Sequence, residues 1–154
     1  AAALSLGTGR GRLEVPGDAE VSPGARLGGG DDAGGDVELR GLDEYFAGAD
    51  RVRPVRAIKC DVEGHELEVF KGGARLLEED GPVLLFECEA RHRGSGGVDD
   101  VFSFLRGLGY VGRFFDGAVL RPVEEFVLSE RQPSGPGRFW DEPGYCNNFV
   151  FERT

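Results

Sequence analysis

Residues 56–89, RAIKCDVEGHELEVFKGGARLLEEDGPVLLFECE, decide the fold because they predict a strand, a helix and a second strand in succession. Residues 57–62 form a short apolar run that ends in acid, and residues 83–86 are continuously apolar, as expected of a strand covered on both faces. Residues 65–79 have helical spacing and predict one helix, which the Gly-Pro pair at 81–82 ends. The apolar residues on one face of that helix are Leu67, Phe70, Ala74 and Leu77.

Carboxylates follow both predicted strands at their carboxyl ends. Asp61 and Glu63 follow the first strand, and Glu87 and Glu89 end the second. Two strands of one sheet that are joined by a helix run parallel, so these groups meet at the edge where open α/β sheets bind ligands. Carboxylates there can hold a divalent metal, accept a proton from a hydroxyl, or bind the amino group and hydroxyls of a cofactor. The plainer alternative is that Glu63 or Glu66 caps the helix and that Glu87 is solvated.

The segments on either side extend this unit to an α/β fold with a mixed sheet. We expect strands over residues 2–6, 12–15, 37–40, 110–115, 118–123 and 148–153, and helices over residues 42–46 and 98–108. Asp116-Gly117 predicts a hairpin turn. GTGRG at residues 7–11 also predicts a hairpin turn, since no helix follows to complete a nucleotide-binding loop. Residues 16–36 predict a flexible glycine-rich loop.

Composition and charge exclude several classes of function. The 154 residues suffice for one domain, and the net charge of −10 disfavours nucleic acid as a partner. No apolar run approaches the roughly 20 residues of a membrane span, and residues 1–6 lack a basic n-region and are too short for a signal peptide. We therefore expect neither a signal peptide nor a membrane partner. The widely spaced Cys60, Cys88 and Cys146 predict buried thiols in a reducing compartment, here the cytoplasm, and no motif suggests zinc or another metal.

The two histidines differ in their surroundings. His65 lies in the first turn of the predicted helix beside Asp61 and Glu63, where a carboxylate would raise its pKa and make it a usable base. The alternative is an ordinary surface histidine. His92 is a weaker candidate, because it stands between two arginines in a polar loop.

A resemblance to a known family rests on the central stretch. IKCDVEGHELEVFKGGARLL, followed by PVLLFECE, resembles the signature of the FkbM family of S-adenosylmethionine-dependent methyltransferases. That signature has a strand end IK-x-D-V-E-G-x-E, a helix closing in GA-x-x-L, and a Pro-led strand ending in Glu. Upstream, VELRGLDEYF and ALSLGTGRGRLEVP are similar to further family segments. The resemblance covers residues 1–89 and extends more loosely to the last strand.

The resemblance implies a class I methyltransferase fold, a Rossmann-like mixed sheet that is mostly parallel with an antiparallel end. It implies S-adenosylmethionine as cofactor and methyl transfer to a hydroxyl of a sugar or small natural product. Asp61 would lie beside the sulfonium and the acceptor, with Asp61 or His65 as base. Asp61 and Glu63 would face the cofactor, and Glu63 would orient the turn. The residues expected on the acceptor side are Glu87, Glu89 and His92, with Trp140 and Tyr145 in the loops that shape the pocket.

One departure from the family pattern affects the expected cofactor pocket. The family's glycine-rich cofactor loop and first strands would lie before residue 1, so the chain is expected to begin near the third strand, as one partial methyltransferase domain. We therefore expect the 154-residue chain alone to bind S-adenosylmethionine weakly or not at all. Apolar sheet faces would then be exposed and would favour self-association.

Two other functions remain open at this point. A strand followed by Glu-Gly, with an acidic pair on a neighbouring strand, also resembles the Toprim module. Glu63 and the pair Glu87 and Glu89 would then hold magnesium. The second alternative is a non-catalytic remnant or binding module. A glycine-rich loop encoded upstream would favour the methyltransferase over the remnant.

Overall fold

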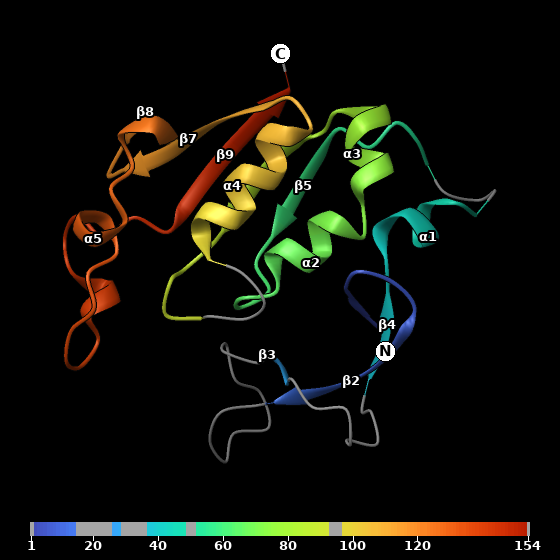
Figure 1. The fold of residues 1–154 in the computed structure, drawn as a ribbon, viewed down its shortest axis with the longest axis horizontal. Coiled ribbons are helices and arrows are strands. Elements are labelled where there is room, and N and C mark those ends of the chain that lie inside the picture. The colour runs from blue at the N-terminus through green and yellow to red at the C-terminus, as the bar shows by residue number, and fades with distance from the viewer. Residues whose placement is uncertain (1, 15–25, 29–36, 49–51, 93–96, 154) are drawn as a thin grey trace.

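The computed structural model describes residues 2–14, 26–28, 37–48, 52–92 and 97–153. It has two mixed β-sheets, with helices packed against the larger one (Figure 1). The predicted α/β class with a mixed sheet is therefore confirmed.

The larger sheet has five strands in the order β5-β6-β9-β7-β8. The strands are β5 (Ala57–Cys60), β6 (Val83–Glu87), β7 (Tyr110–Asp116), β8 (Val119–Pro122) and β9 (Asn148–Arg153). The predicted parallel pairing of β5 with β6 is confirmed. Among the described residues it is the one parallel pairing of this sheet, so the expectation of a mostly parallel sheet is wrong. The last strand, β9, inserts antiparallel between β6 and β7, and β7 pairs antiparallel with β8. The hairpin of β7 and β8 turns at Gly117, as predicted.

Two helices, not one, connect β5 to β6: α2 (Glu66–Lys71) and α3 (Ala74–Asp80). The predicted single helix is wrong because Gly72 and Gly73 interrupt it. A Cβ at Gly72 would lie 2.0 Å from the carbonyl oxygen of Ser5, so the break lets the N-terminal segment pack closely against the helices. The chain leaves α3 at Gly81 in the left-handed conformation, with φ of 59°, as predicted.

The side chain of Asp43 supplies the N-terminal cap of α3. Asp43 lies in α1 (Leu42–Phe46), and its two carboxylate oxygens accept hydrogen bonds from the backbone N–H groups of Arg75 and Leu76, at 3.0 and 2.8 Å. These are two of the amides that a helix leaves without an internal partner. The contact therefore ties the N-terminal part of the chain to the helices that cover the larger sheet.

Replacing Asp43 with alanine is expected to lower the free energy of unfolding by about 1 kcal/mol, the usual cost of losing a cap. Asp99→Ala is the matched control, because Asp99 is an exposed acid in the first turn of α4 and should contribute only a few tenths of a kcal/mol. Urea unfolding of both variants measures the difference. Equal midpoints would show that the Asp43 cap adds nothing to stability.

The smaller sheet has the order β1-β4-β2-β3. Its strands are β1 (Ala2–Leu4), β2 (Gly9–Glu14), β3 (Arg26–Gly28) and β4 (Val37–Arg40). The hairpin predicted around GTGRG is wrong, because β4 lies between β1 and β2, parallel to the first and antiparallel to the second. The glycine-rich loop predicted over residues 16–36 lies mostly outside the described residues, but its residues 26–28 form β3, which composition did not predict.

The core lies on one face of the larger sheet, where α4 (Val98–Gly107) lies along the strands (Figure 1). Successive residues of a strand point to opposite faces. The fully buried residues of the strands on this face are Leu84, Phe86, Phe114, Phe149 and Phe151. On the other face Val83 and Leu85 are 41% and 37% exposed, so the prediction that β6 is covered on both faces is wrong.

The segment that connects β8 to β9 reaches the candidate site. The segment around Trp140, which we expected to be a loop, contains short helices: α5 (Leu128–Arg131) and a 3₁₀ turn at Phe139–Asp141, preceded by another at Val123–Glu125. Through the described part of the chain, no helix combines the length and apolarity needed to cross a membrane. Cys60, Cys88 and Cys146 are buried free thiols, as predicted.

Candidate functional site

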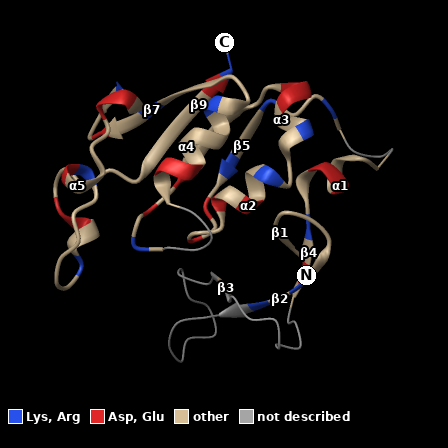
Figure 2. Cartoon of the chain, in the orientation of Figure 1, with Lys and Arg blue, Asp and Glu red and all other residues tan. Residues whose placement is uncertain are grey.

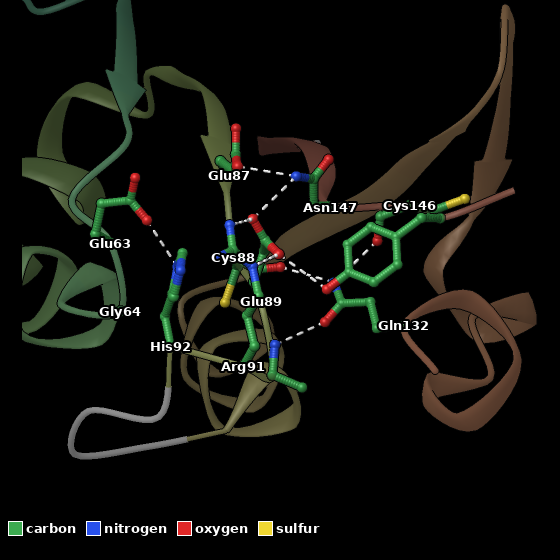
Figure 3. A network of polar contacts seen from close by, with 12 residues as sticks. Glu63, Gly64, Glu87, Cys88, Glu89, Arg91, His92, Gln132, Cys146 and Asn147 are labelled. Atoms are coloured by element: carbon green, nitrogen blue, oxygen red, sulfur yellow. Dashed lines mark hydrogen bonds and ion pairs between the residues drawn. The ribbon is translucent and has the colours of Figure 1, made fainter. Parts of the chain in front are cut away.

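The carboxyl ends of β5 and β6 meet at one edge of the larger sheet. The pairing of Cys60 with Phe86 brings Asp61 and Glu87 to the same level, which confirms the predicted adjacency of the two acidic strand ends. The strand β9 begins at this edge, because it runs antiparallel to β6 and pairs Asn148 with Glu87. Figure 3 shows the polar side chains that gather there.

Asn147 links Glu87, the last residue of β6, to Glu89, which follows the strand. Its amide nitrogen Nδ2 donates hydrogen bonds to Oε1 of Glu87 at 2.8 Å and to Oε1 of Glu89 at 3.2 Å (Figure 3). Glu89 is only 5% exposed and also accepts from Arg91, through Nε at 2.5 Å and Nη2 at 2.8 Å, and from the Tyr145 hydroxyl at 2.8 Å. Glu89 is thus enclosed by donors, while Glu87 is half-buried beside it.

The same surroundings shift the pKa values of the two carboxyl groups in opposite directions. Burial raises the pKa of Glu87 to about 7, and the negative charges of Glu89, Asp61 and Glu63 act in the same direction. Burial also opposes ionisation of Glu89, but hydrogen bonds from Arg91 and Tyr145 outweigh it and lower the pKa of Glu89 below its usual range. Of the two carboxyl groups, Glu89 is therefore the more readily ionised and Glu87 the more readily protonated.

Replacing Glu87 with glutamine is expected to stabilise the protein at pH 8 and to change its stability little at pH 5. The pKa of Glu87 is raised from 4.5, so its contribution to stability is fully present below pH 4.5 and is lost as the pH rises through 7. Glutamine removes that loss, which is about 1 kcal/mol after allowance for solvent screening. Thermal unfolding at both pH values measures it. Glu78→Gln, an exposed acid of α3, is the control, and an equal effect of the two substitutions would contradict the prediction.

The turn after β5 is linked to the loop after β6. Glu63 and Gly64 have positive φ angles of 52° and 96°, and the Glu63 carboxylate lies 2.7 Å from Nδ1 of His92 (Figure 3). Glu66 is 3% exposed, and its carboxylate accepts a hydrogen bond from the backbone N–H of Gly64 at 3.1 Å, which holds the turn. The contact with His92 is compatible with the predicted role of Glu63 in orienting this turn. The capping alternative is not found for either residue, because α2 has no side-chain cap and Glu66 instead accepts from Gly64, which precedes the helix.

His65 points to the smaller sheet. Its Nε2 lies 2.9 Å from the hydroxyl of Ser5, and its Nδ1 lies 3.7 Å from the Glu68 carboxylate. Burial lowers the pKa of His65, and the opposing effect of Glu68 does not compensate. The predicted rise in the pKa of His65 is therefore wrong. Asp61 is half exposed and pairs with the ammonium of Lys59 at 3.1 Å.

The C-terminal connection closes the other side of the site. Gln132 is 5% exposed, accepts from the backbone N–H of Ala90 at 2.7 Å and donates to the carbonyl oxygens of Cys88 and Cys146 at 2.8 and 2.9 Å. The side chain thereby fixes the segment after β6 to the segment before β9.

Three residues of this network were absent from the predicted site: Arg91, Gln132 and Asn147. The guanidinium of Arg91 lies 4.3 Å from the ring centroid of Trp140, which confirms that the loop with Trp140 reaches the site. Asn147 could have been found, because it directly precedes a strand predicted at the antiparallel end of the sheet. Gln132 carries no such signal.

Acidic residues cluster around this edge. The first turn of α2 carries Glu66 and Glu68, and the first turn of α4 carries Asp99 and Asp100 (Figure 2). Negative charge near a helix N-terminus is favourable for the helix itself. Together with Glu87 these acids make the edge of the sheet suited to a cationic or hydroxyl-bearing ligand.

A mixed α/β sheet with a polar site at its strand ends defines a ligand-binding α/β protein. The methyltransferase FkbM domain matches residues 8–111, more than half of the chain, so the chain belongs to the FkbM methyltransferase family. The resemblance drawn from the central stretch is thus confirmed, and the protein is a methyltransferase at the level of its family. Searches of curated proteins and of solved structures gave no significant match.

Proposed function

We propose that the protein transfers the methyl group of S-adenosylmethionine to a hydroxyl oxygen of a sugar or small natural product. The observation that carries the proposal is the meeting of Glu63, Glu87 and Glu89 at the strand ends of a chain from a methyltransferase family. Hydroxyl groups are both donors and acceptors, and ionised carboxylates are strong acceptors for them.

The residues at the edge fit the charge of the proposed cofactor. S-adenosylmethionine carries a positive sulfonium and a positive amino group, and Asp61 and Glu63 lie at the end of β5 beside the acidic first turn of α2. The cofactor supplies a methyl group on a cationic sulfur, which a hydroxyl oxygen attacks directly. We assign Asp61 and Glu63 to the cofactor side because they stand on the strand end and its turn.

The chain contributes mainly alignment of the acceptor with the methyl group. Glu89 is fixed by Arg91, Tyr145 and Asn147. Through Asn147 it positions Glu87, whose partly exposed carboxylate offers the first polar contact to a substrate hydroxyl. His92, held by Glu63, lies on the same side and supplies a second polar contact to the acceptor. Side chains held by a supporting network lose little freedom when they bind.

The proposal is tested on the protein expressed from its complete reading frame. Calorimetry should detect binding of S-adenosylmethionine and of its demethylated product. Radiolabelled methyl groups should then pass to one or more of glucose, rhamnose and catechol, with a mass gain of one methyl group on oxygen. Permethylated glucoside, which has no hydroxyl, is the control acceptor. Failure to bind the cofactor, or transfer to a nitrogen or carbon acceptor only, would contradict the proposal.

A magnesium titration distinguishes the Toprim-like alternative from the proposed methyltransferase. Among the described residues, no group of three or more His, Cys, Asp or Glu side chains is arranged to hold a metal ion. Glu89, one of its proposed ligands, is already engaged by Arg91 and Tyr145. We expect millimolar magnesium to leave the melting temperature unchanged within error, whereas an increase of several degrees that Glu87→Gln abolishes would favour the alternative.

A further inference from the structure

We propose that the carboxylate of Glu87 is the base that accepts the proton of the substrate hydroxyl during methyl transfer. The inference deepens the proposed function and rests on it. It assigns different roles to Glu87 and Glu89, which the sequence places together as residues of the acceptor side.

The contacts of the two glutamates separate their roles. Glu89 has a side chain only 1% exposed and is enclosed by Arg91, Tyr145 and Asn147, so a proton on it would displace strong hydrogen bonds. Glu87 accepts one of the Asn147 hydrogen bonds and remains partly open to solvent. A base must both reach the hydroxyl and release the proton afterwards, and Glu87 meets both conditions.

The groups around Glu87 come from three segments. The charged and polar side chains that face it are Asp61 and Glu63 from the turn after β5, Glu89 from the end of β6, Asn147 from the start of β9 and, through Glu89, Arg91 and Tyr145. Three carboxylates thus act against ionisation of Glu87, while one neutral amide holds its oxygen in place. Two carboxyl groups whose environments push their pKa values apart are the usual arrangement for distinct acid–base roles.

The other candidates are less suited to this step. Asp61 is 49% exposed and its carboxylate is already paired with the ammonium of Lys59. His65 faces Ser5 and Glu68 at the smaller sheet. A general base works best when its pKa lies near the working pH, and the pKa of Glu87 is raised to about 7.

The step is balanced without any further reactant. The hydroxyl oxygen forms a bond to the methyl carbon, the carbon–sulfur bond breaks with its electron pair going to sulfur, and the hydroxyl proton passes to the Glu87 carboxylate. The products are the methyl ether and the neutral thioether. Glu87 then returns the proton to water, which its partial exposure allows.

Carboxyl NMR tests the proton-accepting group independently of activity. The protein is labelled with ¹³C at the glutamate carboxyl carbons and titrated from pH 4 to pH 9. One resonance should titrate near pH 7, disappear in Glu87→Gln, remain in Glu78→Gln, and titrate at lower pH in Glu89→Gln, which removes the neighbouring negative charge. A Glu87 resonance that titrates near pH 4 would overturn the inference.

Kinetics test the role in the reaction, with an acceptor that the wild type methylates. Glu87→Gln should lower kcat by about 10²- to 10⁴-fold, the usual contribution of a general base, and remove the acidic limb of the pH profile. Cofactor binding and KM should stay within a few-fold of wild type, and Glu87→Asp should recover part of the rate. An unchanged kcat in Glu87→Gln would overturn the assignment alone, whereas an inactive wild type that binds no cofactor would overturn the proposed function.

Discussion

Replacing Gly64 with alanine is expected to abolish methyl transfer and to lower the free energy of unfolding by about 3 kcal/mol or more. Gly64 has a φ of 96°, which side chains rarely tolerate, and a Cβ there would lie 2.0 Å from the carbonyl oxygen of His92. The backbone carbonyl of His92 cannot move aside as easily as the end of a flexible side chain could. The substitution would therefore separate the turn after β5 from the loop after β6, and with it Glu63 from His92.

The control for this effect is Gly117→Ala. Gly117 also has a positive φ, 61°, but no atom lies within 4 Å of a Cβ built there. This variant measures the cost of the backbone conformation alone, about 1 kcal/mol, and should keep full activity. Urea unfolding and methyl transfer are measured on both variants. If Gly64→Ala lost no more stability than Gly117→Ala and stayed active, the close contact with His92 would be needed neither for stability nor for methyl transfer.

The elements that local pattern defines were predictable. The apolar runs of β5 and β6, the helical character of the segment between them and the Asp116-Gly117 turn all depend on neighbours in sequence, and all are present, although the segment forms two helices and not one. The acidic edge followed from the parallel crossover alone, since strands of the same direction bring their carboxyl ends together. The family followed from the motif around Asp61, Glu63 and Glu87.

What could not be predicted depends on contacts between distant segments. Helical spacing did not predict the break at Gly72. The break depends on the close approach of the carbonyl oxygen of Ser5, which lies 67 positions earlier in the sequence. The insertion of β4 between β1 and β2 likewise depends on which strands pair, not on the turn that joins two of them. Local propensity is a weak guide wherever tertiary contacts decide.

The candidate site likewise has features that local sequence predicts and features that depend on distant contacts. The residue types at the strand ends could be predicted from the sequence, but the difference between Glu87 and Glu89 could not, because it depends in part on Tyr145 and Asn147, which lie more than 50 residues away in sequence. Asn147 and Tyr145 contact Glu89 because of the register of β9 against β6. Gln132 contacts the backbone on either side of Glu89, at Cys88 and Ala90, from a segment without periodicity. The chemistry of two similar side chains was thus set by long-range packing.

Replacing Arg91 with alanine is expected to lower the free energy of unfolding by about 3 kcal/mol at pH 7, because it leaves the buried Glu89 carboxylate without its counter-ion. The variant also loses the stacking of the guanidinium on Trp140. Arg106→Ala is the matched control: its ion pair with Glu124 is exposed on both sides and should contribute no more than about 0.5 kcal/mol.

The effect of Arg91→Ala should depend on pH with a definite sign. The pKa of Glu89 is lowered from 4.5, so the carboxylate contributes stability above pH 4.5 that is lost as the pH falls through the lower value in the folded protein. Removing Arg91 removes most of that contribution, so the deficit relative to wild type should be largest at pH 7 and shrink toward pH 3, where a protonated Glu89 no longer needs a counter-ion. Urea unfolding at both pH values measures it. A deficit of the same size at both would mean that Arg91 acts through packing on Trp140 and not through the charge of Glu89.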